Sequence, residues 1–392
     1  MAVPFAKIKE TALMAKAIQK SGAVSSSLAQ LRKYYGGPEL NSIALEYLLS
    51  SSTLPLGIII ELFGPEGSGK TTVAVSMIND FFMRLGGEGA LIDTEQKMNE
   101  TLIRSLVDKE AEDDERFRIY RAPTLEQAQQ VMTILGKEIN ALTHGTRRDD
   151  NPHMLGIALD SFRVASESTQ ATVLKSGFAS KSYATEANLW RQYLSTFVSL
   201  LQLTPMLLLV VNHQVERESM HGPVADTGGG KALKYLETYR IQVKAVDKKS
   251  NNSEVYTNLA LRSFKNSNGE AKQVIYPRII YKAPDLEEGI TKVDWSIADA
   301  KLLTSSDVPR SRLASEGICN VTASSKEGLY NDPVNNLKMV PIEEITAAIY
   351  SDPEKISALR KHLTITENKN LDQLYEDGWY KGAKAASADL ED

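Results

Sequence analysis

A glycine-rich loop between an apolar segment and a helical segment constrains the fold of this chain more than any other feature. The loop reads GPEGSGKT from Gly64 to Thr71 and fits the pattern G-x-x-x-x-G-K-[ST]. The apolar run Leu56–Phe63 predicts a strand before it, and Thr71–Leu85 predicts a helix after it. Glycines allow the backbone N–H groups of such a loop to face an anion, and the helix N-terminus adds positive charge. We therefore predict a phosphate-binding loop, in which Lys70 reaches the β- and γ-phosphates of a nucleotide and the Thr71 hydroxyl ligates Mg²⁺.

Composition places this loop in an ordinary globular chain. Hydrophobic residues make up 42% of the 392 residues and charged residues 24%, which argues against a disordered, fibrous or membrane protein. The length suggests two or three domains, and no apolar run approaches the roughly 20 residues that span a bilayer. We therefore expect no membrane partner. The single cysteine, Cys319, excludes an internal disulfide, so we predict a cytoplasmic protein. The net charge of -5 makes nucleic-acid binding less expected without excluding it.

Beyond the loop, short apolar strands alternate with longer helical segments. Strands are predicted at Gly89–Asp93, Leu155–Asp160 and Met206–Asn212, and helices at Leu125–Leu142 and Leu189–Leu203. Continuous apolar strands between helices indicate a parallel sheet that is covered on both faces. After Arg240 the pattern changes to strands joined by polar turns, at Tyr239–Val246, Leu259–Phe264 and Val274–Tyr281.

We expect three parts along the chain. Residues 1–37 form an N-terminal helical segment, since apolar residues recur at helical spacing from Phe5 to Lys20; this helix packs on its own domain or docks on a neighbouring subunit. Residues 38–284 form the α/β core, which ends near the Ala283–Gly289 segment. Residues 285–392 form a smaller α+β domain with helices at Ile342–Tyr350 and Pro353–His362 and an acidic tail.

Two further strands end in acidic residues. Leu155–Asp160 ends in Asp160, and the strand that ends at Asp93 is followed closely by Glu95. Because ligands of open parallel sheets lie outside the carboxyl ends of the strands, all three motifs meet at one edge. Asp160 would then hold the metal and Glu95 would polarise a water molecule, which favours an ATPase over a passive nucleotide binder.

These motifs, in this order, resemble the RecA recombinase family over about residues 38–282. The resemblance lies in LNSIAL (from Leu40), LPLG (from Leu54), IELFGPEGSGKTT (from Ile60), IDTE (from Ile92), LDS (from Leu159), VVNH (from Val210) and TGGGKALKY (from Thr227). The most selective of these is the G-G-x-A-L-K stretch from Gly229 to Lys234. The Asn-His pair at Asn212 and His213 is similar to phage recombinases of the UvsX type, since the family often has Gln after the Asn.

The resemblance implies a RecA-like P-loop ATPase core with a mostly parallel central sheet. It also implies a DNA-dependent ATPase that forms helical filaments on single-stranded DNA, pairs them with a homologous duplex and exchanges strands. ATP and Mg²⁺ would be the cofactors. The partners would be single- and double-stranded DNA, further copies of the chain, and single-strand-binding and loader proteins. Two alternatives stay open, namely a RecA-fold ring motor of the helicase type and a nucleotide-gated coating protein with little turnover.

The family's functional residues fall on definite positions. Glu95, Lys70 and His213 would be catalytic, with His213 or else Gln214 sensing the γ-phosphate. The nucleotide would be bound by Gly64, Pro65, Glu66, Gly67, Ser68, Gly69, Lys70, Thr71, Thr72, Asp160 and Lys265, and the metal by Thr71 and Asp160. Subunit interfaces would involve Lys234, Arg240 and Lys265.

Two polar segments are the expected DNA-binding loops. Ser166–Tyr183 is lightly basic, and Val215–Gly230 ends in a run of glycines that permits close approach to phosphates. Neither has the dense basic and aromatic composition of a strong single-strand binder, so DNA binding follows mainly from the resemblance. The residues assigned to DNA are Lys175, Lys181, Arg191, Arg217, Met220, Gly228, Gly229 and Gly230.

The sequence departs from the family at two places. In the family, two lysines of the adjacent subunit reach the nucleotide; Lys265 matches the first, but Ser267 stands at the second. An adenine-stacking tyrosine expected shortly after Glu95 is missing, with Leu102 or Arg104 in that region. Both departures concern coupling between subunits and base selectivity rather than hydrolysis.

Overall fold

The computed structural model describes most of the predicted core and the region after it. The described residues are 37–97, 100–107, 115–145, 154–163, 182–219, 222–227, 231–269, 271, 273–283, 290–306 and 308–368. The predicted N-terminal helix, the Ala283–Gly289 boundary apart from Ala283, and the acidic tail lie outside them, as does most of the Ser166–Tyr183 loop.

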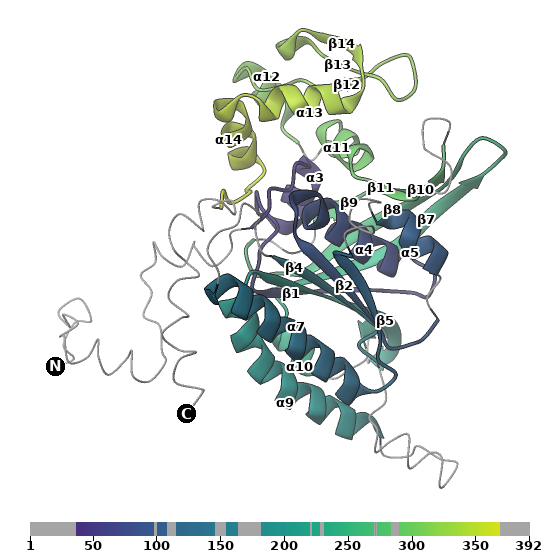
Figure 1. Ribbon diagram of the computed structural model, residues 1–392. Coiled ribbons are helices and arrows are strands. Elements are labelled where there is room, and N and C mark those ends of the chain that lie inside the picture. Colours follow the sequence, from purple (N-terminus) through teal and green to yellow (C-terminus); the bar gives the residue numbers. More distant parts are fainter. Residues whose placement is uncertain are drawn as a thin grey trace, which may run out of the picture.

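One large sheet organises the molecule, with 11 strands among the described residues (Figure 1). Its central part is parallel, in the order β7-β1-β5-β4-β2-β3. These strands are β1 (Ile58–Gly64), β2 (Glu88–Asp93), β3 (Phe117–Arg121), β4 (Leu155–Asp160), β5 (Met206–Ser219) and β7 (Tyr239–Ser250). Beyond β7 the sheet continues with antiparallel pairs. These involve β8 (Val255–Asn266), β10 (Arg278–Lys282) and β11 (Lys292–Asp294), while β6 (Gly222–Thr227) pairs with β5 and β9 (Val274–Ile275) with β8.

Helices cover both faces of the parallel strands, as the apolar strands predict (Figure 1). One face carries α3 (Ile43–Leu49), α4 (Lys70–Phe81) and α5 (Glu100–Leu106), with the short η3 (Met83–Leu85) after α4. The other carries α7 (Leu125–Gly145), α9 (Ser182–Leu203) and α10 (Lys231–Leu236). Successive residues of β1 enter opposite cores: Ile58 and Ile60 pack with α4, and Ile59 packs with the other layer.

The C-terminal lobe, residues 296–363, combines helices with a three-stranded antiparallel sheet at one end of the molecule (Figure 1). Its elements are α11 (Ser296–Leu303), α12 (Arg310–Ser315), β12 (Thr322–Ala323), β13 (Tyr330–Asp332), η4 (Pro333–Asn335), β14 (Leu337–Val340), α13 (Ile342–Tyr350) and α14 (Pro353–His362). The predicted α/β class with a smaller α+β region is thereby confirmed. That residues 285–392 form a separate domain stays a prediction.

Two predictions about local structure are wrong. The segment from Val215, expected to be an open loop, is a hairpin in which residues 214–219 of β5 pair with residues 222–227 of β6. Its polar side chains gave no alternation of apolar and polar residues, yet backbone hydrogen bonding suffices to pair the two strands. The run Val274–Tyr281, expected to be one strand, is divided into β9 and β10 around Pro277, which has no N–H to donate to a ladder.

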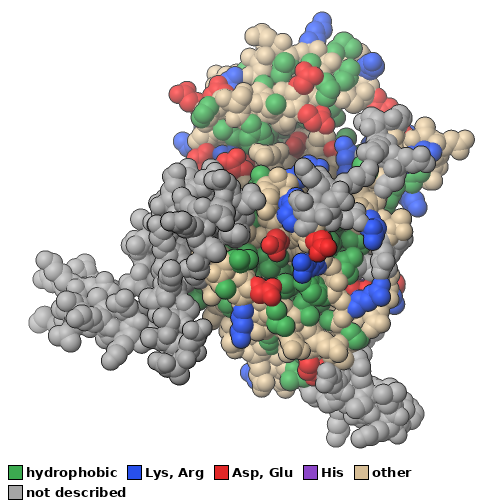
Figure 2. Space-filling view, viewed as in Figure 1, with side chains coloured by type: hydrophobic (Ala, Val, Ile, Leu, Met, Phe, Trp, Pro, Cys, Tyr) green, Lys and Arg blue, Asp and Glu red, His purple; other side chains and the backbone are tan. Residues whose placement is uncertain are grey.

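The surface matches the balanced composition. On the face in Figure 2, described Lys and Arg side chains are interspersed with Asp and Glu over both the core and the C-terminal lobe. Within the described ranges, no helix is long and apolar enough to cross a bilayer.

Candidate nucleotide-binding and catalytic site

The loop from Gly64 to Gly69 joins β1 to α4 and forms a tight cradle. A Cβ on Gly64 would lie 2.1 Å from the carbonyl oxygen of Val243, so no larger residue fits beside β7. Gly69 adopts φ +89° as the N-cap of α4, a conformation that favours glycine. The first turn of α4 therefore starts directly at the loop, with its N–H groups directed to the same space.

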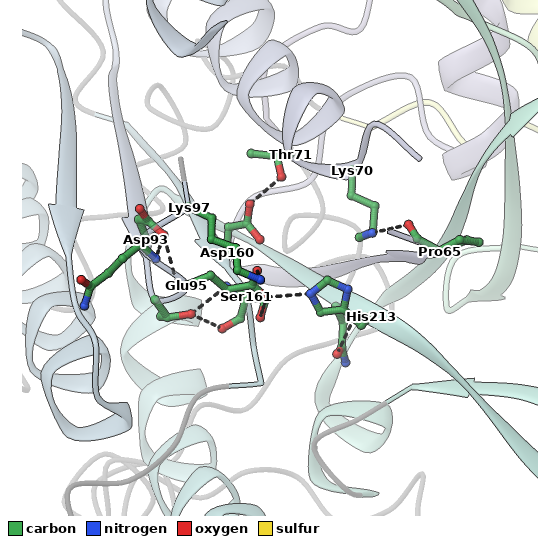
Figure 3. A network of polar contacts seen from close by, with 12 residues as sticks. Pro65, Lys70, Thr71, Asp93, Glu95, Lys97, Asp160, Ser161 and His213 are labelled. Carbon is green, nitrogen blue, oxygen red and sulfur yellow. Dashed lines mark hydrogen bonds and ion pairs between the residues drawn. The ribbon is translucent and has the colours of Figure 1, made fainter. Parts of the chain in front are cut away.

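Two buried polar groups in the cradle are not paired with an anion, and one of them has no hydrogen-bond partner among the described residues. The Ser68 hydroxyl is buried and has no hydrogen-bond partner among the described residues. The Lys70 ammonium is also buried, and donates to the carbonyl oxygens of Gly64 (3.1 Å) and Pro65 (2.7 Å) in its own loop (Figure 3). Burial lowers the pKa of Lys70, although the nearby carboxylates oppose that shift. A phosphate group would supply the acceptors that both groups require, so the cradle fits a nucleotide.

Asp160 faces the start of α4 from the end of β4. Its Oδ2 accepts a hydrogen bond of 2.5 Å from the Thr71 hydroxyl (Figure 3). Burial raises the pKa of Asp160, against the opposing effect of the Thr71 hydrogen bond. A carboxylate beside a threonine hydroxyl, next to a phosphate cradle, is the oxygen donor set that suits Mg²⁺. Thr71 and Asp160 thus lie where the sequence predicts a metal.

Glu95 is held in place from two sides. Its Oε1 accepts from the Ser161 hydroxyl (2.8 Å) and lies 2.6 Å from Nε2 of His213 (Figure 3). The turn before it is fixed by Asp93, whose Oδ1 accepts from the backbone N–H groups of Glu95 and Gln96. Partial burial acts to raise the pKa of Glu95, but the hydrogen bonds from His213 and Ser161 outweigh it and lower the pKa. Glu95 is therefore an oriented carboxylate at neutral pH.

Strand register explains why these groups meet. Gly64 pairs directly with His213 across β1 and β5, and Asp93 pairs with Asp160 across β2 and β4. The carboxyl ends of four parallel strands consequently bring the predicted residues to one edge. The structure distinguishes the two sensor candidates geometrically, because Gln214 instead accepts from the side chain of Gln242.

The predicted interface residues all make contacts within this chain. Lys265 donates to the carbonyl oxygens of Lys234 and Glu237 at the end of α10. Arg240 binds Glu61 at 2.7 Å rather than projecting outward. Ser267, at the position of the family's second lysine, donates to the carbonyl oxygen of Thr238.

The structure bears on few of the predicted DNA-binding residues. Arg191 is exposed on α9, and Arg217 lies in the hairpin strand β5. The others, Lys175, Lys181, Met220, Gly228, Gly229 and Gly230, lie outside the described residues.

Sequence reasoning missed three residues that support the site. Ser161 holds Glu95, while Asn212 and Glu61 form a buried hydrogen bond of 2.8 Å beneath the sensor strand. A signal existed for Glu61, which is the only charged residue in the apolar strand β1. Such a residue is expected to be paired in the interior, but its partner cannot be read from the strand itself.

Comparison with known proteins agrees with this geometry. A family model described as the RecA N-terminal domain matches residues 16–143, which contain the phosphate cradle and Glu95. Protein RecA of Pseudarthrobacter chlorophenolicus is 29% identical over 250 residues, which cover 59% of this chain and 65% of the relative. Protein RecA of Caldanaerobacter subterraneus is 27% identical over 255 residues (61% and 68%), and that of Saccharopolyspora erythraea 28% over 262 residues (62% and 70%). The chain is therefore similar to RecA proteins over about 60% of its length.

The similarity to these relatives covers only part of each protein. The alignments span about two thirds of the length of these relatives and about 60% of this chain. This similarity agrees with the expected α/β fold.

Proposed function

We propose that this chain is an ATP-dependent recombinase of the RecA family. It would form helical filaments on single-stranded DNA, pair them with homologous duplex DNA and exchange strands in recombinational repair. The observation that carries the proposal is the meeting of the phosphate cradle, Asp160, Glu95 and His213 at one sheet edge. We place it in the cytoplasm, with single-strand-binding and loader proteins as further partners, and we favour the phage UvsX-type branch because His213 follows Asn212.

The residues would promote phosphoryl transfer by position and charge. Lys70 would leave the carbonyl oxygens of its loop for the β- and γ-phosphates of ATP, so that its charge offsets theirs. Glu95, kept ionised by Ser161 and His213, would accept a hydrogen bond from the attacking water and orient it. The Ser68 hydroxyl would donate to a phosphate oxygen. Thr71 and Asp160 would hold Mg²⁺, which when bound supplies further positive charge to the phosphates.

His213 would report the state of the nucleotide. Its contact with Glu95 places an imidazole at the edge where the γ-phosphate would lie. β5 runs without interruption from His213 into the hairpin that continues to Thr227. Loss of phosphate would thus change contacts at the base of the hairpin, which we propose as a DNA-binding element.

A second candidate function follows from Ser267. Because this residue replaces a lysine that would reach the neighbouring nucleotide, subunit coupling would depend on Lys265 alone. A filament with weakened coupling could coat DNA under nucleotide control with little hydrolysis. Measuring D-loop formation separates the two candidates, since a recombinase forms joint molecules and a coating protein does not.

The direct test compares DNA-stimulated ATP hydrolysis in the wild type and in Lys70→Ala. We expect the variant to lose on the order of a hundredfold or more in turnover, because a charge-stabilising donor is removed. Lys137→Ala, at an exposed position of α7, is the matched control and should keep wild-type turnover. Equal turnover in Lys70→Ala and the control would reject the site.

The form of the assembly needs its own measurement. Electron microscopy with single-stranded DNA and a non-hydrolysable ATP analogue should show helical filaments. Closed rings would instead support a RecA-fold motor of the helicase type.

A further inference from the structure

A buried polar chain connects the nucleotide edge of the sheet to the base of the β5–β6 hairpin. The backbone N–H of His213 donates to Oδ1 of Asn212 (2.9 Å), and Nδ2 of Asn212 donates to Oε1 of Glu61 (2.8 Å). On the other side of Glu61, Nε of Arg240 donates to Oε2 (2.7 Å). A terminal guanidinium nitrogen of Arg240 then donates to the hydroxyl of Thr227 (2.9 Å).

This polar chain lies in the interior of the sheet. Asn212 and Glu61 are fully buried, Thr227 is 1% exposed, and the side chain of Arg240 is 16% exposed. Burying an ion pair rarely stabilises a protein more than well-packed apolar residues would, because both charges lose their hydration. The ion pair between Glu61 and Arg240 therefore contributes little to stability, but it fixes the positions of the side chains that it joins.

The guanidinium of Arg240 is directed to Glu61 by its surroundings. It lies 4.6 Å from the centre of the Phe63 ring, a cation–π contact. The other buried carboxyl nearby belongs to Glu237, which is 2% exposed. Burial, together with the negative charge of Glu61, raises the pKa of Glu237 well above its usual range. Glu237 therefore favours its protonated form, and the carboxyl group that Arg240 contacts directly is that of Glu61.

The two ends of the polar chain lie at the two proposed functional elements. His213 contacts Glu95 through its ring while its backbone N–H belongs to the polar chain. Thr227 is the last residue of β6 and directly precedes Gly228. A shift of β5 at His213 would alter Asn212 and Glu61, and hence the position of Arg240 against Thr227. Contiguous hydrogen-bonded side chains are one physical means of coupling two sites, which a measurement of coupling can test.

We propose that Arg240 is a positioning residue that couples the nucleotide site to the DNA-binding hairpin, through Glu61 and Asn212 on one side and Thr227 on the other. The inference rests on the proposed function, since it names a route by which nucleotide state would control DNA affinity. Arg240 touches neither nucleotide nor DNA in this role. It sets where the hairpin base lies relative to His213.

The test removes only the last contact of the polar chain. Thr227→Val keeps the side-chain volume and the preference for a strand but lacks the hydroxyl that accepts from Arg240, whereas Thr227→Ser keeps the hydroxyl. Affinity for single-stranded DNA is measured with a non-hydrolysable ATP analogue and with ADP, along with basal ATP hydrolysis and the thermal midpoint. Coupling is the ratio of the two DNA affinities.

We expect Thr227→Val to lower this ratio about fivefold or more, and Thr227→Ser to retain it. If Thr227→Val lowers the thermal midpoint but keeps the wild-type ratio, the contact is purely structural. That result would overturn this inference and leave the proposed function standing. If the wild type itself shows no effect of nucleotide on DNA affinity, the proposed function fails and the inference fails with it.

Discussion

Two clusters of buried charge in this molecule differ in how completely they are paired. One is the nucleotide site, and the other is the lobe seam, where α3 of the core meets the C-terminal lobe. In the lobe seam Arg360 makes two hydrogen bonds of 2.8 Å with Glu46, and the Tyr350 hydroxyl donates to the same carboxylate. Asp299 of α11 accepts from the Ser42 hydroxyl and from a backbone N–H at the start of α3.

The nucleotide site is paired less completely. Ser68 has no hydrogen-bond partner among the described residues, and Lys70 bonds only weak neutral acceptors of its own loop in the contacts given above. In the seam the charge of Glu46 is paired with Arg360 within the protein, whereas Lys70 in the cradle is held only by neutral carbonyl oxygens. Buried charge is therefore structural where the chain itself completes the pairing, and it indicates a ligand where the chain does not.

The largest expected effect is a loss of catalysis that leaves stability nearly unchanged. Glu95→Gln keeps the shape of the side chain but loses the charge that orients water, so kcat for ATP should fall on the order of a thousandfold. The thermal midpoint should change little, because the glutamine side chain keeps an oxygen that can accept from the Ser161 hydroxyl. Glu88→Gln, at the exposed start of β2, is the control for both measurements. A large loss of stability in Glu95→Gln would show that Glu95, like the residues of the seam, has a structural role.

The converse change belongs to the lobe seam. Arg360→Met leaves Glu46 buried and unpaired, so the free energy of unfolding should fall by about 3–5 kcal/mol in urea titrations. The double variant Glu46→Gln, Arg360→Met should recover part of that loss, because no buried charge stays uncompensated. Arg312→Met, which removes an exposed pair in the same lobe, should leave the unfolding midpoint unchanged. If Arg360→Met unfolded at the same midpoint as this control, the Glu46–Arg360 pair would not stabilise the fold.

Asp299 makes the stability of the seam depend on pH. Burial raises the pKa of Asp299 to about 7, above its value in the unfolded chain. The native carboxyl then holds its proton more tightly, so its contribution is complete at low pH and is lost as the pH rises toward 7. Relative to Asp299→Asn, the wild type should lose on the order of 1 kcal/mol per pH unit between about pH 5 and 7. Unfolding curves measured across this range would contradict the assignment if both proteins followed the same pH dependence.

The smallest effect concerns a helix cap. Ser42 is the N-cap of α3 and also donates to Asp299. Ser42→Ala should cost about 1 kcal/mol of unfolding free energy, the usual value of an N-cap. Ser42→Thr, which keeps the hydroxyl, should cost less. Chemical denaturation resolves the difference, and equal losses in both variants would exclude the hydroxyl as the cause.

Local sequence determined the elements of the core and the chemistry of its edge. The loop between Gly64 and Thr71, the apolar strands and the acids at their ends follow from short-range pattern, because glycine conformation and burial on two faces leave few alternatives. The same reasoning failed for the 214–227 hairpin, whose backbone pairing leaves no apolar pattern in the side chains.

Which residues far apart in the sequence form hydrogen bonds and ion pairs is known only from the folded structure. The bond between Glu61 of β1 and Arg240 of β7, and that between Glu46 and Arg360, join positions 179 and 314 residues apart. Hydrogen bonds act over about 3 Å, whereas the sequence records only order along the chain, so such partners become known when the strands are in register and the lobe is docked. That is why residue types at the sheet edge could be predicted before the structure, and the polar chain beneath it could not.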